Sequence, residues 1–271
     1  RGVLAEKVKV ANATYKQYQA ALKNKQYDES KLLIARALKI WKDNQEFISA
    51  FKASQISIIA SRDVCESRLA GHGKRSKGRC YDMVSQTTKG PIMIVLPAGA
   101  GHDSPFAFSK FEISVNEFNE YCSQTKKCQK INKSGNLPVT GISIDQARDY
   151  VAWLSEISGA RYRIPTDVEW TYAANAGGKQ PTGKSYNCTL RLGDKIIKGT
   201  GLEDVNSGKQ NGWGLANYLG NAQEWVESAS GLKAKGGAYK DAMQECTIEL
   251  ERAHDGKPDA YTTFRVVRDV T

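Results

Sequence analysis

A short segment from Asn217 to Trp225, with the sequence NYLGNAQEW, has the residue types of a cation-binding loop. Its glycine and asparagines disfavour helix and strand and favour a tight turn. In such a turn side-chain oxygens can converge with backbone carbonyls, and oxygen ligands of this kind suit a hard cation such as calcium. The alternative interpretation is a metal-free surface turn that ends in a buried Trp225.

Cysteines are the second group of residues with chemistry of their own. The chain has an even set without a CxxC pair, namely Cys65, Cys80, Cys122, Cys128, Cys188 and Cys246. Such a set favours three disulfides and an oxidising, extracytoplasmic compartment, although six buried thiols in a cytosolic protein are the alternative. Many connectivities are possible, and the most natural pairs are Cys65–Cys80, Cys122–Cys128 and Cys188–Cys246.

Histidine and nucleophile patterns are sparse. The three histidines, His72, His102 and His254, are far apart and show neither HxxxH nor HxH spacing. Metal-binding histidines usually occur in such pairs, so no iron site is expected. A GxSxG nucleophile motif is also absent from the sequence.

Positive charge is concentrated in the first third of the chain. Residues 1–90 contain 18 Lys and Arg against 8 Asp and Glu, whereas residues 91–271 contain 21 of each. A basic region can attract an acidic polymer, nucleic acid or anionic headgroups. Aromatic residues do not alternate with the basic ones, so we interpret the region as a solvated helical face and expect no nucleic-acid partner.

Two regions must position these residues, and they differ in pattern. Residues 1–60 carry apolar side chains at helical spacing and are predicted to form a small helical module. Within it, Asp43 with Glu46 predicts a capping box for a helix through about Ala60. Residues 61–90, centred on GHGKRSKGR, are predicted to be a basic, loop-rich linker. No apolar run is long enough to span a membrane.

Residues 91–271 are predicted to form one α+β domain. Three helix starts fit the capping-box pattern, namely Ser114 with Glu117, Ser143 with Gln146, and Thr166 with Glu169. From Gly177 to Asn217 the sequence has little periodicity, which predicts long irregular loops held by short strands.

Three ordered segments of this domain carry a family resemblance. They are PVTGISIDQARDYVAWLSEISGARYRIPTDVEWTYAANAGG (Pro138–Gly178), KGGAY (Lys235–Tyr239) and FRVVRD (Phe264–Asp269), on either side of the NYLGNAQEW loop. This order resembles the formylglycine-generating enzyme, or sulfatase-modifying factor, family over about Pro91 to Val270. The resemblance implies an irregular C-type-lectin-like fold.

The resemblance also implies a ligand set for calcium in the loop. It consists of the Asn217 and Glu224 side chains with the Gly220 and Ala222 carbonyls. All four positions keep the family's spacing and residue type, whereas Gln223 replaces the tryptophan that usually precedes the glutamate.

The catalytic positions of the family are not kept. Its oxidase members bind copper through two cysteines five residues apart, and these positions fall here on Asp241 and Cys246. Copper(I) prefers soft thiolates, and a carboxylate is a hard ligand that cannot replace one. We therefore expect neither copper binding nor conversion of cysteine to formylglycine.

The sequence thus predicts a catalytically silent, extracytoplasmic ligand-binding or sensory domain. The segments IMIVLPAG and FAFSKFEISVNEFNEYC look like the version found in bacterial transmembrane serine/threonine kinases, which implies a membrane segment before Arg1. The ligand, or a partner protein of the cell envelope, is not identified by any motif.

Two alternatives of other classes stay open. One is a structural or interaction module of an envelope complex. The other is an oxidoreductase with an altered metal site that includes Asp241 and Cys246.

Overall fold

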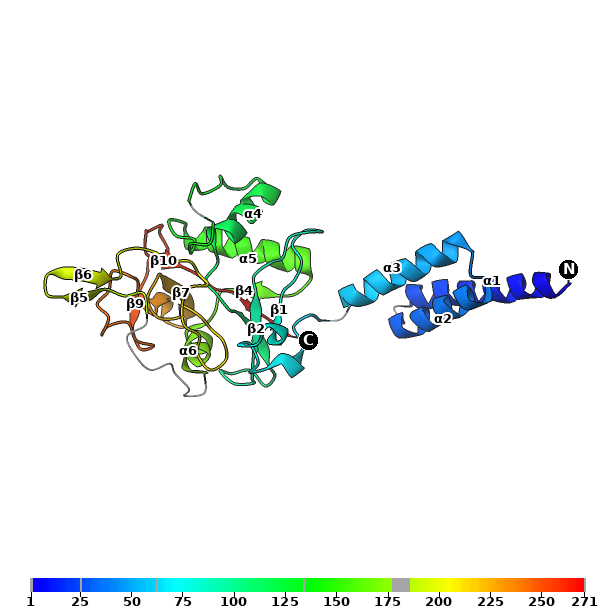
Figure 1. Ribbon diagram of the computed structural model, residues 1–271, viewed down its shortest axis with the longest axis horizontal. Coiled ribbons are helices and arrows are strands. Elements are labelled where there is room, and N and C mark those ends of the chain that lie inside the picture. The colour runs from blue at the N-terminus through cyan, green and yellow to red at the C-terminus, as the bar shows by residue number, and fades with distance from the viewer. Residues whose placement is uncertain (1, 25, 62, 134, 177–185, 271) are drawn as a thin grey trace. The chain divides into compact units, whose positions relative to one another are not determined.

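The computed structural model describes residues 2–24, 26–61, 63–133, 135–176 and 186–270. The chain divides into two compact units, Arg1–Asp63 and Val64–Thr271, which are described separately (Figure 1). The first unit is helical and the second combines helices with several small sheets, so the predicted α+β class is confirmed.

The first unit is a helical module with a core of its own. Its helices are α1 (Gly2–Lys23), α2 (Tyr27–Ile40) and α3 (Gln45–Ser61). Buried side chains from all three helices form one cluster, which includes Ala11, Tyr18, Ile34, Ala37 and Phe47. The prediction that Asp43 caps α3 is wrong, because the Asn44 side chain accepts the hydrogen bond from the Phe47 backbone N–H (3.0 Å). Asn44 directly precedes the first helical residue, which is the position of an N-cap.

Residues 64–90 belong to the second unit, so the predicted linker over residues 61–90 is wrong for most of its length. A disulfide joins Cys65 to Cys80, and Cys80 pairs with Met93 in a sheet. Both cysteines and Val84 are buried in the main core of the second unit. The segment is basic and rich in turns, but a covalent bond and a strand pairing attach it to the domain.

Short strands and three helices form the frame of the second unit. The helices are α4 (Val115–Thr125), α5 (Ile144–Ser158) and α6 (Asp167–Asn175). The strands are β1 (Arg79–Cys80), β2 (Met93–Leu96), β3 (Phe106–Ser109), β4 (Tyr162–Arg163), β5 (Leu190–Leu192), β6 (Lys195–Lys198), β7 (Gln223–Ser228), β8 (Gly231–Lys235), β9 (Glu251–Ala253), β10 (Thr262–Thr263) and β11 (Val267–Arg268). Among the described residues they form sheets in the orders β1-β2-β3-β11-β4, β10-β7-β8-β9 and β5-β6.

The largest sheet is buried on both faces at its centre. Strands β2 and β3 pair antiparallel, with Ile94 opposite Phe108. Because side chains alternate along a strand, Met93 and Val95 enter one core with α4 and α5, and Ile94 and Leu96 enter another core with α6. The continuous apolar run at β2 is therefore explained by burial on both sides.

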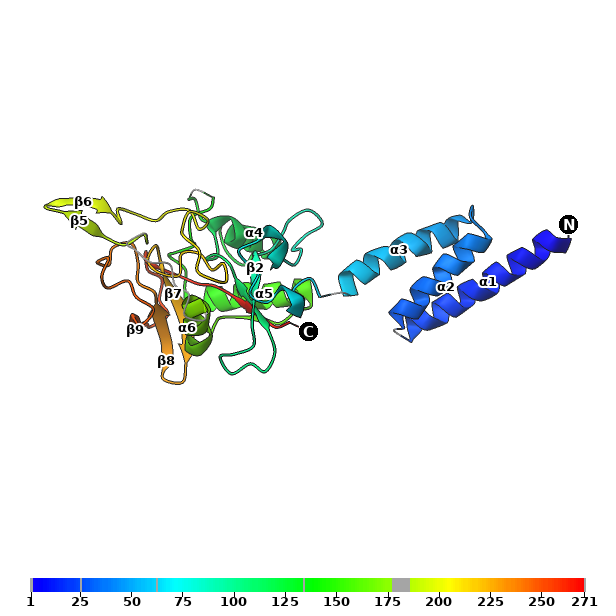
Figure 2. The same cartoon turned by 60° about the horizontal axis from the view of Figure 1, so that its bottom comes forward.

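The three α-helices described in the second unit, α4, α5 and α6, begin with the predicted capping boxes. The side chains of Ser114, Ser143 and Thr166 each accept a hydrogen bond from the backbone three residues later, and the glutamate or glutamine there bonds back. Helices α4 and α5 lie together in both views of the molecule (Figures 1 and 2). The hairpin β5–β6 projects away from the rest of its unit in the same views.

The cysteines pair as Cys65–Cys80, Cys122–Cys128 and Cys188–Cys246, the connectivity favoured by the sequence. Three disulfides indicate an oxidising, extracytoplasmic environment. Among the described residues, no helix combines the length and the apolar character that crossing a membrane requires.

Candidate functional site

Glu224, the acidic residue of the NYLGNAQEW loop, lies in β7 and is 1% exposed. Its carboxylate accepts hydrogen bonds from Trp170 Nε1 (2.7 Å) and Arg265 Nε (2.8 Å). Arg265 is also fully buried, and its remaining nitrogens donate to the backbone carbonyls of Lys110 and Ala216. A buried charge is tolerated when it is paired and hydrogen-bonded in this way. Glu224 and Arg265 therefore form an internal ion pair within the fold.

A second buried carboxyl group, Glu112, lies beside this pair. Asn221 Nδ2 donates to one of its oxygens (2.8 Å) and Asn217 Nδ2 to the other (3.2 Å). Burial raises the pKa of Glu112 to about 8; the Arg265 guanidinium opposes this rise and the Glu224 carboxylate adds to it. Burial likewise raises the pKa of Glu224, again against the effect of Arg265.

Two of the predicted calcium ligands, Asn217 and Glu224, are engaged in contacts within the protein. The Glu224 carboxylate faces a guanidinium, and a calcium ion there would place two more positive charges next to it. Asn217 directs its amide nitrogen at Glu112 and at the Val205 carbonyl, so its side chain acts as a donor. These contacts disfavour the use of the Asn217 and Glu224 side chains as calcium ligands. Calcium binding at this loop stays a prediction.

The loop packs closely against a disulfide. Gly220 has a φ of 75°, and a Cβ added there would lie 2.4 Å from Cys188 Sγ. Only glycine fits so close an approach without a shift of the backbone. The turn of this loop and the Cys188–Cys246 bond are therefore parts of one packed region.

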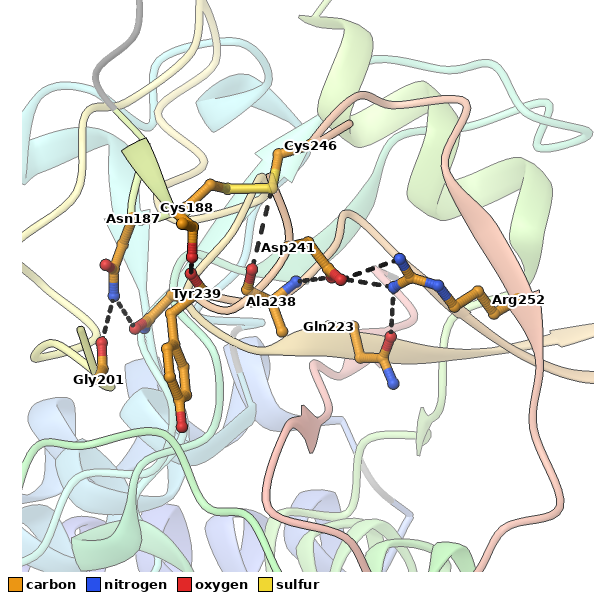
Figure 3. Close-up of a disulfide and its surroundings, with 11 residues drawn as sticks. Asn187, Cys188, Gly201, Gln223, Ala238, Tyr239, Asp241, Cys246 and Arg252 are labelled. Carbon is orange, nitrogen blue, oxygen red and sulfur yellow. Dashed lines mark hydrogen bonds and ion pairs between the residues drawn. A yellow bond between two sulfur atoms is a disulfide. The ribbon is translucent and has the colours of Figure 1, made fainter. Parts of the chain in front are cut away.

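Asp241, the first of the two positions that correspond to the copper ligands, is held in a salt bridge. Its carboxylate oxygens accept hydrogen bonds from Arg252 Nη1 (2.9 Å) and Nη2 (3.0 Å), and one of them also accepts from the Ala238 backbone N–H (Figure 3). Arg252 Nη1 also donates to Gln223 Oε1 (3.1 Å). Gln223 occupies the position of the tryptophan that is usual in the family, so a polar network replaces an aromatic residue and a thiolate.

Cys246, the second of these positions, is bonded to Cys188 and is 4% exposed (Figure 3). A sulfur atom in a disulfide cannot act as a thiolate ligand or nucleophile. Neither position therefore offers the soft ligand that copper(I) requires.

Two partly buried histidines, His102 and His254, are hydrogen-bonding partners of carboxylates. His102 contacts Glu169, which is also bound by Arg163; burial would raise the pKa of Glu169, but these hydrogen bonds lower it to about 2. His254 Nε2 lies 2.9 Å from Asp259. Within the described residues, no group of three or more His, Cys, Asp and Glu side chains has the arrangement of a metal site.

The sequence did not identify Glu112, Arg252 or Arg265 as important residues. Arg265 lies in the FRVVRD segment, which carries part of the family resemblance. The segment does not indicate that Arg265 pairs with a buried glutamate. Glu112 and Arg265 have partners 109 and 155 residues away in the chain, and no local pattern marks Arg252 as the partner of Asp241.

Taken with this geometry, comparison with known proteins identifies the class. Residues 6–270 match the Sulfatase-modifying factor enzyme 1-like domain, so the chain belongs to this formylglycine-generating-enzyme-like family.

Named relatives differ in their stated activity. The chain is 33% identical over 111 residues to "Inactive C-alpha-formylglycine-generating enzyme 2" of Bos taurus, covering 36% of this chain and 35% of the relative. It is 31% identical over 106 residues to "Formylglycine-generating enzyme" of Thermomonospora curvata, covering 33% of each. The aligned part thus spans about a third of these relatives' length. The family therefore includes proteins named as active and as inactive.

Solved structures share the fold. PvdO from Pseudomonas aeruginosa superposes with a TM-score of 0.57 at 20% identity, covering 70% of this chain and 98% of that one. Treponema denticola variable protein 1 gives a TM-score of 0.51 at 15% identity, covering 66% and 95%. At these identities the likeness concerns the fold alone.

Proposed function

We propose that this chain is a non-catalytic binding domain of the formylglycine-generating-enzyme-like family. One observation carries the proposal: the two positions that correspond to copper thiolates are Asp241, paired with Arg252, and Cys246, bonded to Cys188. Copper(I) prefers soft thiolate ligands, and neither position supplies one. We therefore expect the chain not to hold the copper ion that oxidation of a substrate cysteine requires.

The disulfides support a location outside the cytoplasm, where they persist. In that location the domain would bind a small molecule or an envelope protein, and a transmembrane serine/threonine kinase is the receptor type that we propose for it. Binding would be transmitted only through a difference in affinity between two arrangements of the receptor.

The test of the proposal is an oxidase assay with a cysteine-containing peptide. The purified chain is incubated with copper(I), oxygen and the peptide, and mass spectrometry measures conversion of cysteine to formylglycine. We expect none, and conversion by the unaltered chain at a rate above that of copper alone would overturn the proposal.

A matched variant makes a negative result informative. Asp241→Cys combined with Cys188→Ser supplies a thiol at one position and frees Cys246 at the other. Recovery of copper binding in this variant would show that the two substitutions account for the loss. The single variant Asp241→Cys, in which Cys246 stays paired, is the control.

A structural module is the second candidate, and one observation favours it. The projecting hairpin β5–β6 carries Leu192, Ile196 and Ile197 at 72%, 43% and 56% exposure. Exposed apolar side chains on one element are typical of a protein-contact surface. Copurification that is lost on replacing all three by serine would support this candidate.

A further inference from the structure

A cavity of about 420 Å³ lies between α4, α5 and residues 84–90, outside the positions discussed above. Small-molecule sites commonly have volumes of roughly 300–1,000 Å³. Its lining includes two buried aromatic residues and four charged ones, namely Tyr150, Trp153, Lys89, Glu117, Glu120 and Lys130.

The two aromatic residues have side-chain polar atoms without a hydrogen-bond partner among the described residues. Tyr150 is 1% exposed and Trp153 is 7% exposed, and both pack on neighbouring rings. Neither the Tyr150 hydroxyl nor the Trp153 N–H makes a hydrogen bond to a residue that the structure describes. Neither atom is fully enclosed by the protein without a hydrogen-bond partner. Both residues line the cavity, so a ligand there can approach these two polar atoms.

The four charged residues are not paired with one another. Glu117 accepts hydrogen bonds from Ser114, and Glu120 accepts one from Gln124. Lys89 lies over the Tyr81 ring, with its Nζ 4.5 Å from the ring centroid. Over the described parts of the chain, none of the two glutamates and two lysines takes part in an ion pair. The cavity is thus bordered by two acidic and two basic side chains that are not in ion pairs among the described residues.

The charges distinguish between classes of ligand. A simple anion would be repelled by Glu117 and Glu120, and a simple cation by Lys89 and Lys130. A neutral sugar would leave all four charges without a counter-charge. A molecule with one group of each sign satisfies both pairs, and the Tyr150 hydroxyl and Trp153 N–H add hydrogen bonds at the buried floor. Burial raises the pKa of Glu117, and an ammonium group beside it would lower that pKa again.

We propose that this cavity binds a small zwitterion, a free amino acid or a short peptide, with its ammonium toward the two glutamates and its carboxylate toward the two lysines. The inference rests on the proposed binding function and names its ligand class.

The test is a thermal-shift screen of the oxidised chain, followed by calorimetry. The probes are the common L-amino acids and a set of dipeptides. Each active probe is compared with its N-acetylated amide, which has neither charge. We expect stabilisation by a zwitterion and none by its neutral derivative at the same concentration.

Three variants locate the binding. Tyr150→Phe keeps the packed ring and removes only the hydroxyl, and we expect its affinity to fall about tenfold. Lys130→Met and Glu120→Gln lie at the partly exposed rim and should each weaken binding without unfolding the chain. Lys127→Met and Glu156→Gln, which are exposed and do not line the cavity, are the matched controls.

Some outcomes would overturn the inference. They are the absence of any shift with zwitterions, an equal shift with the neutral derivatives, stabilisation by neutral sugars alone, or full affinity in Lys130→Met and Glu120→Gln. These failures are distinguishable from failure of the proposed function, because the latter is judged by peptide conversion and does not depend on amino-acid binding.

Discussion

The Glu224–Arg265 pair and the Asp241–Arg252 pair have similar chemistry but very different surroundings. The first is sealed, with exposures of 0% and 1%, whereas the Arg252 side chain is 39% exposed. The first includes Glu224, which the resemblance assigns to calcium, and the second includes Asp241, which the resemblance aligns with a copper ligand. We expect the sealed pair to contribute more to the stability of the fold than the partly exposed one.

Removing the sealed arginine should have the largest effect. Arg265→Met leaves the buried Glu224 without its counter-charge, so we expect a loss of about 3–5 kcal/mol in the free energy of unfolding. Denaturant unfolding measures this loss. Arg161→Met, at a side chain that is 74% exposed, is the control and should cost less than about 1 kcal/mol. Equal losses in the two variants would contradict the structural role of the sealed pair.

The disulfide beside the altered catalytic positions should be the second most important element. Cys188–Cys246 closes a separation of 58 residues and Cys122–Cys128 one of 6. The chain-entropy argument gives about 4 kcal/mol for the longer loop and about 2 kcal/mol for the shorter one. Double serine variants of each pair, compared by denaturant unfolding, test this order. A greater loss at Cys122–Cys128 would show that loop closure does not explain the role of Cys188–Cys246.

The buried Glu112 should make stability depend on pH. Because its pKa is raised to about 8, the folded chain holds a proton that the unfolded chain releases above about pH 4.5. Stability should therefore fall between pH 5 and pH 7, by on the order of 1–3 kcal/mol. Melting temperatures across this window should decline in the parent and change less in Glu112→Gln.

We limit the expected fall in stability to the range from pH 5 to pH 7, because a second buried group titrates near pH 7. Burial lowers the pKa of Lys110 to about 7, so above that pH the unfolded chain binds more protons there and stability rises. If the melting temperatures of the parent chain and of Glu112→Gln changed equally with pH below pH 7, Glu112 would not be the cause of the decline.

Chelation should have the smallest effect. Because Arg265 occupies the Glu224 carboxylate, we expect EDTA and added calcium to leave the melting temperature unchanged. A fall on chelation that is abolished by Asn217→Ala would contradict this expectation and support calcium binding at the loop.

Local sequence patterns predicted the local structure well. The three capping boxes of the second unit depend on residues three positions apart, and all are present. The wrong N-cap prediction at Asp43 is off by one residue, because the neighbouring Asn44 is an equally good capping residue. The three cysteine pairs favoured by the sequence are also present, although spacing alone did not exclude other connectivities.

Interactions between distant segments were not predictable. Arg265 meets the Lys110 carbonyl 155 residues away, and Asn221 meets Glu112 at a separation of 109. The linker prediction failed for the same reason, because strand pairing with Met93 decides where that segment belongs. The sequence could show that a thiolate position was lost at Asp241, but not that Arg252 had become its partner.

The most direct test of the central claim is a titration of the oxidised chain with copper(I) in competition with a chelator. The claim predicts that the chain takes no copper from the chelator, because Asp241 is paired with Arg252 and Cys246 with Cys188. One equivalent of tightly bound copper, lost in Cys246→Ser, would contradict it.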